Sequence, residues 1–340
     1  MRDTYRRLSC RLLRALGRRV PPSRHDGRAI ETAIVLIPEL YGDTILTTPL
    51  LLALRALSPG VEITAVGTGP GVRLLAHDAA VRHAVHLRRA SPAERARVFD
   101  RRFDVLLSTK DHPSFTNLRL VRRIQAEYRI GFDHPGHEGF FDALVERPDQ
   151  MPVWEKVAGL VEPLGATVST APRPYLPDGP VSEAVRTFVS TLVADESVLA
   201  VNISASKPEK RWPTARWRSV LAGIDRPVVL LAAPEHTADR HRLEAELPNA
   251  VPSPPTASLF DVAHIVRHAA ALLSTDTATV HVASCSDTPV LALYRNPRDL
   301  AKFPPLSSRN RVLLARDSDL ESIGPDAVRE GLNELEREFT

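Results

Sequence analysis

An acidic residue follows the first strand-like run of the chain. Residues 32–37 are mostly apolar, and Gly42 and Asp43 come shortly afterwards, just before a helical pattern. Ligands of parallel α/β sheets bind at the carboxyl ends of strands, so Asp43 is placed to act as a general base on a substrate hydroxyl. The alternative is structural, because an acid in the first turn of a helix stabilises that helix by about 1 kcal/mol.

Two of the chain's five lysines lie three residues apart, between a strand-like run at 198–203 and a helical pattern. The other basic residues of the chain are 39 arginines. An ammonium group is a compact charge suited to a diphosphate, and nearby serine hydroxyls add hydrogen bonds. The alternative is a solvated loop that Trp212 anchors in the core. The candidate phosphate ligands are Ser204, Ser206, Lys207 and Lys210.

A third group follows the strand-like run 270–274. Asp276 ends the strand, and the amides from Thr277 to Val280 begin a helix, where free N–H groups form a site for an anion. His281 comes one helical turn after Thr277 and shares its face. The alternative is that Asp276 caps the helix and His281 packs in the core.

Three consecutive polar residues follow the strand-like run 103–108. They are Lys110, Asp111 and His112. Their place at a carboxyl end makes them candidates for lining the pocket of a second, acceptor substrate.

The sequence predicts no metal site and no nicotinamide cofactor. His134 and His137 lack a third ligand at a convincing spacing. Residues 67–71 are rich in glycine, but they follow the second strand-like run and do not form the Gly-x-Gly-x-x-Gly pattern of dinucleotide-binding folds. We therefore expect neither a metal ion nor another cofactor.

Strand-like and helical runs alternate along the chain, which is typical of parallel α/β sheets. Residues 171–180 contain four prolines and are interpreted as a linker. We expect two Rossmann-like, doubly wound domains, 29–170 and 181–340, that face each other across a cleft. Residues 44–57 and 153–164 are each expected to form one helix. The predicted strands are residues 32–37, 61–66, 83–87, 103–108, 128–130, 198–203, 227–232, 270–274, 289–294 and 311–314.

Composition excludes several classes of protein. The 340 residues exceed one ordinary hydrophobic core, and 43% hydrophobic with 25% charged residues is typical of a soluble globular protein. No apolar run is long enough to span a membrane, and the first residues lack the apolar core of a signal peptide. Cys10 and Cys285 suggest no disulfide framework. We expect a cytoplasmic protein, and a monomer.

Positive charge is concentrated in residues 1–28. That segment carries nine arginines and two aspartates, a net +7, whereas the whole chain carries +3. A nucleic-acid binder spreads positive charge over a domain face, so nucleic acid is not an expected partner. Tyr5, Leu8 and two further leucines recur at helical spacing, a pattern that binds anionic membrane surfaces. We expect residues 1–20 to hold the protein at the inner face of the inner membrane; the alternative is a solvated leader or an upstream translation artefact.

Taken in order, these residues resemble glycosyltransferase family 9, the bacterial heptosyltransferases of the GT-B fold. The resemblance extends from about residue 33 to residue 339. Residues 128–132 and 303–305 are looser matches in the right order. Its most specific pieces are Gly42-Asp43 with the run up to Arg55, Lys210-Arg211-Trp212-Pro213, and Asp276-Thr277 with His281.

The resemblance implies a role for each candidate residue. Asp43 corresponds to the catalytic base, and Lys210 to the lysine that contacts the donor phosphates. The family uses ADP-heptose-like donors, needs no metal ion and inverts the anomeric centre. Ala278 stands where the family motif has a glycine. The residues that would bind the donor nucleotide-sugar are Ser204, Ser206, Lys210, Asp276, Thr277, Ala278 and His281.

We therefore expect an inverting, metal-independent glycosyltransferase. It would move a heptose-like sugar from a nucleotide diphosphate to a hydroxyl of a lipopolysaccharide core or another glycan. One alternative is a catalytically degenerate GT-B protein that binds nucleotide or membrane. The other is a nucleotide-sugar epimerase on the same fold.

Overall fold

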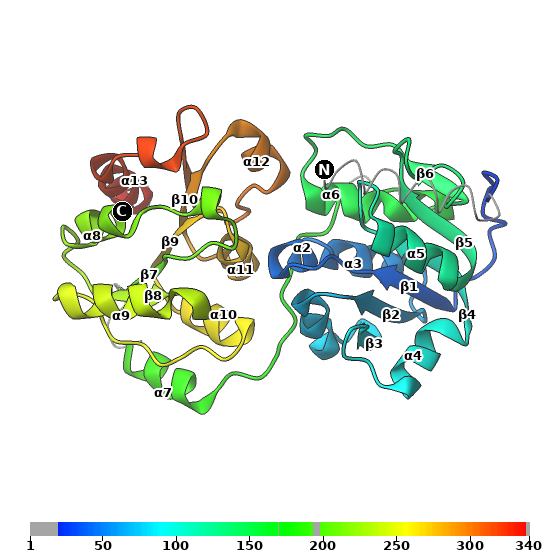
Figure 1. Cartoon of the computed structure of the whole chain (residues 1–340), viewed down its shortest axis with the longest axis horizontal. Coiled ribbons are helices and arrows are strands. Elements are labelled where there is room, and N and C mark those ends of the chain that lie inside the picture. Colours follow the sequence, from blue (N-terminus) through cyan, green and yellow to red (C-terminus); the bar gives the residue numbers. More distant parts are fainter. Residues whose placement is uncertain (1–19, 169, 193–197, 338–340) are drawn as a thin grey trace. The chain divides into compact units, whose positions relative to one another are not determined.

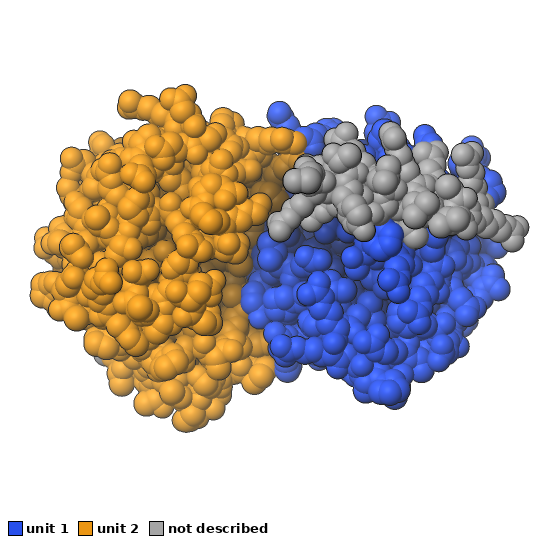
Figure 2. All heavy atoms as spheres, in the orientation of Figure 1, with its two compact units in different colours: residues 1–177 blue, residues 178–340 orange. Residues whose placement is uncertain are grey.

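A computed structural model describes residues 20–168, 170–192 and 198–337. The chain divides into two compact units, Met1–Pro177 and Asp178–Thr340, coloured separately in Figure 2. The boundary between the units falls inside residues 171–180, the predicted linker. Each unit is described by itself below.

The first unit is built on a sheet of six parallel strands in the order β3-β2-β1-β4-β5-β6 (Figure 1). This is the strand order of a Rossmann fold with its sixth strand in place. The predicted strands are found with small shifts at their ends, and the short β6 is an addition that the sequence did not predict. The strands are β1 (Thr32–Leu36), β2 (Glu62–Gly67), β3 (Val81–His86), β4 (Arg102–Ser108), β5 (Gln125–Phe132) and β6 (Ala143–Val145).

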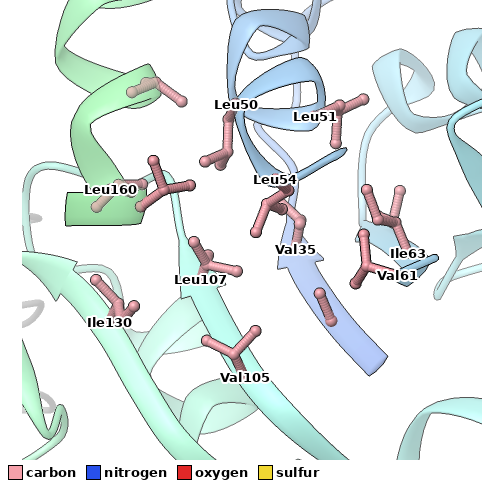
Figure 3. Close-up of a cluster of buried hydrophobic side chains, with 14 of the residues drawn as sticks. Val35, Leu50, Leu51, Leu54, Val61, Ile63, Val105, Leu107, Ile130 and Leu160 are labelled. Atoms are coloured by element: carbon pink, nitrogen blue, oxygen red, sulfur yellow. The ribbon is translucent and has the colours of Figure 1, made fainter. Parts of the chain in front are cut away.

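Both faces of this sheet are buried, which explains why β1 is apolar without alternation. Alternate residues of β1 enter different clusters: Ala33 and Val35 lie in one, and Ile34 and Leu36 lie in the other. Figure 3 shows the first cluster, where leucines of a covering helix meet residues from the neighbouring strands β2, β1, β4 and β5. The residues labelled there are Val35, Leu50, Leu51, Leu54, Val61, Ile63, Val105, Leu107, Ile130 and Leu160.

Of two predicted helices of the first unit, one is divided and the other has the predicted extent but changes type along its length. The helix expected at 44–57 is two helices, because Pro49 has no N–H for a continuing hydrogen bond and a new helix starts just before it. The helix expected at 153–164 turns into a 3₁₀ helix in its second half and ends at Gly165, whose φ of 91° favours glycine. The helices are α2 (Tyr41–Ile45), α3 (Thr48–Leu57), η1 (Pro70–His77), α4 (Pro92–Phe99), α5 (Phe115–Arg123), α6 (Val153–Ala158) and η2 (Gly159–Leu164).

The second unit has a parallel sheet of five strands in the order β11-β10-β9-β7-β8. This is the flavodoxin-like variant of the doubly wound fold, so the predicted α/β architecture is confirmed in both units. The strands are β7 (Leu199–Asn202), β8 (Val228–Leu231), β9 (Ala271–Thr275), β10 (Val290–Tyr294) and β11 (Asn310–Leu314). The helices are α7 (Glu183–Leu192), η3 (Pro208–Lys210), α8 (Thr214–Leu221), η4 (Pro234–His236), α9 (Thr237–Glu246), α10 (Leu259–Arg267), α11 (Ala278–Ser286), α12 (Pro297–Lys302), η5 (Leu320–Ser322) and α13 (Pro325–Arg337).

A tryptophan pair stands in the core of the second unit. Trp212 and Trp217 are almost fully buried, with ring centroids 4.8 Å apart in an edge-to-face arrangement. Leu332 and Leu335 of α13 belong to the same cluster. Trp212 therefore anchors the loop that carries Lys210, as the alternative interpretation of this segment predicted. This anchoring does not exclude a binding role for the loop, which depends on its polar side chains.

Hydrogen bonds attach the linker to the first unit and the residues just after the linker to the second unit. In the first unit the Tyr175 hydroxyl donates to Asp78 Oδ2 at 2.6 Å, and the Tyr175 amide donates to Thr48 Oγ1 at 2.9 Å. In the second unit the Ser182 amide donates to Asp261 Oδ1 at 2.7 Å. The stretch between Tyr175 and Ser182, which these hydrogen bonds attach to neither unit, is therefore short.

Part of the predicted basic leader belongs to the first unit. The Val20 amide donates to Gly139 O at 3.1 Å, and the Ser23 amide donates to Asp142 O at 2.9 Å. Residues 1–19 lie outside the described residues, so the expected membrane-binding segment is not described. Among the described residues, no helix combines the length and the apolar character needed to cross a membrane.

Candidate functional site

The candidate residues gather at the point in each sheet where the strand order reverses. In the first unit this point lies between β1 and β4, which are followed by Asp43 and Lys110 respectively. In the second unit it lies between β7 and β9, which are followed by Lys210 and Asp276. Ligands of open α/β sheets bind at these switch points, so each unit has a candidate binding edge of its own.

Asp43 is the third residue of α2 and is partly buried. The residue in the N-cap position is Leu40, which makes no side-chain cap, so Asp43 is not itself the N-cap. Its backbone oxygen accepts a hydrogen bond from Thr47 Oγ1 at 2.9 Å. The helix dipole favours a negative charge in the first turn, so the ionised carboxylate that a general base requires is compatible with this position.

Two glycines allow α2 to pack against the loop after β2. A Cβ atom on Gly71 would lie 2.0 Å from Thr44 Oγ1, and a Cβ atom on Gly69 would lie 2.2 Å from Glu39 O. Neither distance is possible for real atoms, so only glycine permits this close approach. The glycine-rich run 67–71 therefore supports the turn that carries Asp43.

The three polar residues after β4 separate into two groups. Asp111 accepts hydrogen bonds from His112 Nδ1 at 2.9 Å and from Lys156 Nζ at 3.4 Å. The bond from His112, together with the charge of Lys156, holds the pKa of Asp111 well below its usual range. Lys156 is only 6% exposed, so Asp111 is the counter-ion of a buried ammonium. Lys110 instead lines a small cavity whose lining includes neither Asp111 nor His112.

In the second unit, Lys210 forms an ion pair with Asp276. Lys210 is the last residue of η3, and its Nζ also lies 5.6 Å from the ring centroid of Phe303, within cation–π range. Asp276 is 6% exposed; burial raises its pKa, and the charge of Lys210 acts in the opposite direction. The structure therefore brings together two residues that the sequence places 66 positions apart.

Asn202 at the end of β7 connects the residues around this pair. Its Nδ2 lies 2.9 Å from Ser204 O, 3.2 Å from Ser274 Oγ and 3.0 Å from Thr277 Oγ1. Ser204 Oγ donates to Asn202 Oδ1 at 3.0 Å and accepts from the Ala233 amide at 3.0 Å. The Ser204 hydroxyl thus donates its proton to Asn202, and its two hydrogen bonds hold the turn after β7 in place.

The start of α11 is left without a side-chain cap. Thr277 is the N-cap residue, but its hydroxyl lies 3.1 Å from Ser274 Oγ and 2.8 Å from Thr279 Oγ1 instead of capping the helix. The first amides, including that of Ala278, therefore begin a helix of nine residues without a capping side chain. Ser206 is exposed and makes no contact that ties it to this group.

His281 is buried beside the same pair. It is 4% exposed, and its ring centroid lies 6.3 Å from that of Phe303. Burial, with a smaller contribution from the charge of Lys210, lowers the pKa of His281 to about 4. His281 Nδ1 has no hydrogen-bond partner among the described residues. The imidazole is neutral at pH 7 and retains unused hydrogen-bonding capacity.

Sequence reasoning missed Asn202, Phe303 and Lys156 as site residues. Asn202 is a polar residue ending a strand of buried apolar residues, and this could have identified it. Phe303 had a signal only in the looser family match at residues 303–305, and Lys156 had none; each enters its site through a contact distant in sequence.

No cluster of three or more potential metal ligands occurs in the described part of the chain. His137 is fully buried and its Nδ1 lies 2.8 Å from Phe132 O, a bond that fixes the loop after β5. His134 and His137 have ring centroids 5.5 Å apart.

Two doubly wound units, each with candidate residues at its switch point, define the GT-B class of fold. Solved structures of this class cover most of the chain at low sequence identity. A glycosyltransferase family 9 protein from Veillonella parvula has a TM-score of 0.71 at 19% identity and covers 91% of this chain and 98% of its own. The ADP-heptose lipopolysaccharide heptosyltransferase II of Escherichia coli has a TM-score of 0.70 at 20% identity, covering 89% and 98%.

The family is shown by sequence. The model of glycosyltransferase family 9 (heptosyltransferase) matches residues 96–324, and the chain belongs to this family. Lipopolysaccharide heptosyltransferase 1 of Escherichia coli strain K12 is 26% identical over 152 residues, which are 44% of this chain and 47% of that protein. The sequence match thus spans about half the length of that curated relative.

Proposed function

We propose that the protein is a glycosyltransferase that moves a heptose-like sugar from a nucleotide diphosphate to a glycan hydroxyl. The observation that carries the proposal is the meeting of Lys210, Asp276 and the uncapped start of α11 at one switch point. An ammonium and free helix amides together suit a diphosphate. The Escherichia coli heptosyltransferase WaaC has been solved with ADP, and family membership supports an ADP-linked sugar as the donor here.

In the proposed reaction, Asp43 removes the proton from an acceptor hydroxyl. The resulting oxygen attacks the anomeric carbon of the donor on the side opposite the diphosphate, which inverts that centre and releases the nucleotide diphosphate. A positioned general base contributes about 10²- to 10⁴-fold to the rate. The acceptor proposed is a lipopolysaccharide core or a similar glycan.

Charge on the leaving diphosphate is stabilised by Lys210 and the amides of α11. Asp276 pairs with the ammonium of Lys210 and holds it in place before the donor arrives. His281, neutral at pH 7, offers a hydrogen bond without adding charge. Lys210 and the amides of α11 supply the positive potential, so we propose a reaction that needs no metal ion.

Substitution of Asp43 by Asn tests the proposal. The variant is expected to lose turnover of ADP-heptose with a lipopolysaccharide-core acceptor by at least 100-fold, on the scale of a lost general base. Its thermal shift with ADP should remain, because a nucleotide bound to the folded protein raises apparent stability by mass action. Asp133→Asn, an exposed carboxylate of the same unit, is the matched control.

Each other outcome has a distinct meaning. A full transfer rate in Asp43→Asn would show that Asp43 is not the base. Consumption of donor without acceptor would favour an epimerase. No thermal shift with any nucleotide or nucleotide-sugar would favour a protein that has lost donor binding.

A further inference from the structure

A small cavity lies at the switch point of the first unit, beside the turn that carries Asp43. It has a volume of about 30 Å³ and opens at the carboxyl ends of β1, β2 and β4. Thr109 Oγ1 donates to Leu36 O at 2.8 Å, which ties the ends of β1 and β4 together beneath it. The apolar part of its wall includes Leu36, Val66 and Leu120, and the polar part includes Glu39, Lys110 and Asn117.

The polar wall contains both signs of charge. Lys110 makes no ion pair and no hydrogen bond with any residue that the structure describes. Glu39 Oε1 accepts a hydrogen bond from Thr68 Oγ1 at 3.4 Å. Asn117 Nδ2 donates to Ser108 Oγ at 2.8 Å, which leaves the amide oxygen as an acceptor. The cavity thus presents donors and acceptors together above an apolar surface.

Size limits what can enter. A water-sized group needs roughly 10–15 Å³ of such space, so the cavity takes about two groups of that size. A sugar ring is too large, but one polar substituent of a ring fits.

Charge limits the occupant further. A carboxylate or phosphate would be attracted by Lys110 but repelled by Glu39. An ammonium group would be attracted by Glu39 but repelled by Lys110. A neutral hydroxymethyl group can donate to Glu39 and accept from Lys110, while its carbon lies against the apolar wall. Such a site selects by penalising charged competitors as well as by attracting the neutral group.

We propose that this cavity binds a neutral hydroxymethyl or diol substituent of the acceptor sugar, with Glu39 and Lys110 as the specificity-determining residues. The inference rests on the proposed function and deepens it by naming the chemistry of the acceptor. Glu39 lies in the same turn as Asp43, four residues before it. An acceptor held at Glu39 would therefore be held by the same segment that carries the base.

A matched pair of sugars tests the inference without donor or turnover. Methyl β-D-glucopyranoside and its glucuronide differ only at C6, where a hydroxymethyl group is replaced by a carboxylate. Saturation-transfer NMR with the full chain should show millimolar binding of the glucoside, with the strongest saturation at the C6 protons. The glucuronide should bind more weakly, because the attraction of Lys110 and the repulsion of Glu39 offset each other and the carboxylate still loses its hydration in the cavity.

Two variants and a control separate the contributions. Glu39→Gln should remove the preference against the glucuronide, and Lys110→Met should weaken binding of the glucoside. Glu146→Gln, an exposed carboxylate of the same unit, should leave both affinities unchanged. Equal or tighter binding of the glucuronide by the unmodified protein, an unchanged preference in Glu39→Gln, or no binding of either sugar at tens of millimolar would overturn the inference. Because no transfer is measured, this result is independent of the outcome for Asp43→Asn.

Discussion

The buried, neutral His281 should make the second unit sensitive to mild acid. In the folded unit the pKa of His281 is about 4, against 6.5 for an ordinary histidine. As the pH falls below 6.5, the histidine of the unfolded chain binds a proton and that of the folded unit does not. His281 therefore contributes its full stability above pH 6.5, and this contribution is lost as the pH falls toward 4.

The size of the loss follows from the two pKa values. The complete difference corresponds to roughly 3 kcal/mol, and at pH 5 the loss is about 2 kcal/mol relative to pH 7. The substitution His281→Gln keeps a polar side chain but removes the titration. The free energy of unfolding of the unmodified protein should therefore fall relative to that of the variant by about 2 kcal/mol between pH 7 and pH 5.

The chain offers a specific probe for this measurement. It has three tryptophans, and Trp212 and Trp217 lie in the core of the second unit. In a Trp154→Phe background, urea unfolding followed by tryptophan fluorescence reports on that unit alone, which avoids treating two units as one transition. His268→Gln, at an exposed histidine of the same unit, is the control. Parallel stabilities of the unmodified protein and His281→Gln from pH 7 to pH 5 would refute the reasoning.

Three further substitutions have expected outcomes. Asn202→Leu leaves several buried polar partners unpaired, and urea titration should show a loss of about 2–4 kcal/mol together with weaker ADP binding by calorimetry. Gly71→Ala forces the Thr44 side chain and the Leu40 backbone away from the new Cβ. The transfer rate should fall while the thermal shift with ADP is kept. An unchanged rate would contradict the conclusion that Gly71 supports the turn that carries Asp43. Leu54→Ala empties a site that is 1% exposed, so stability of the first unit should fall by roughly 2–5 kcal/mol in thermal unfolding, with a smaller loss indicating that the core collapses around the gap.

The fold could be predicted from the sequence because the central strands of the two sheets are buried and therefore largely apolar. β1 is apolar from Ala33 to Leu36 and β9 from Ala271 to Leu273, and both strands were predicted from these runs. β6 could not be found, since three residues give no periodicity. The division into α2 and α3 was also missed, although Pro49 marks it, because the leucines on both sides of that proline continue one helical pattern.

The candidate site was predictable only where it follows directly from a strand end. Asp43, Lys210 and Asp276 each come soon after a buried strand, and parallel strands bring their carboxyl ends to one edge. The pairing of Lys210 with Asp276 and the choice of Asn202 as the hydrogen-bond centre depend on which strands are neighbours. Strand order is set by packing of the whole unit, and no local pattern encodes it.

The division of the chain at Pro177 has an evolutionary consequence. Every residue that the structure brings together around Lys210 lies after this point, and the Asp43 turn with its cavity lies before it. Each unit also buries its own core. A single recombination event in the linker would thus exchange one set of binding residues as a block and leave the other intact. Under the proposed function, donor and acceptor preferences in such a lineage would diversify by exchange of whole units as well as by point mutation.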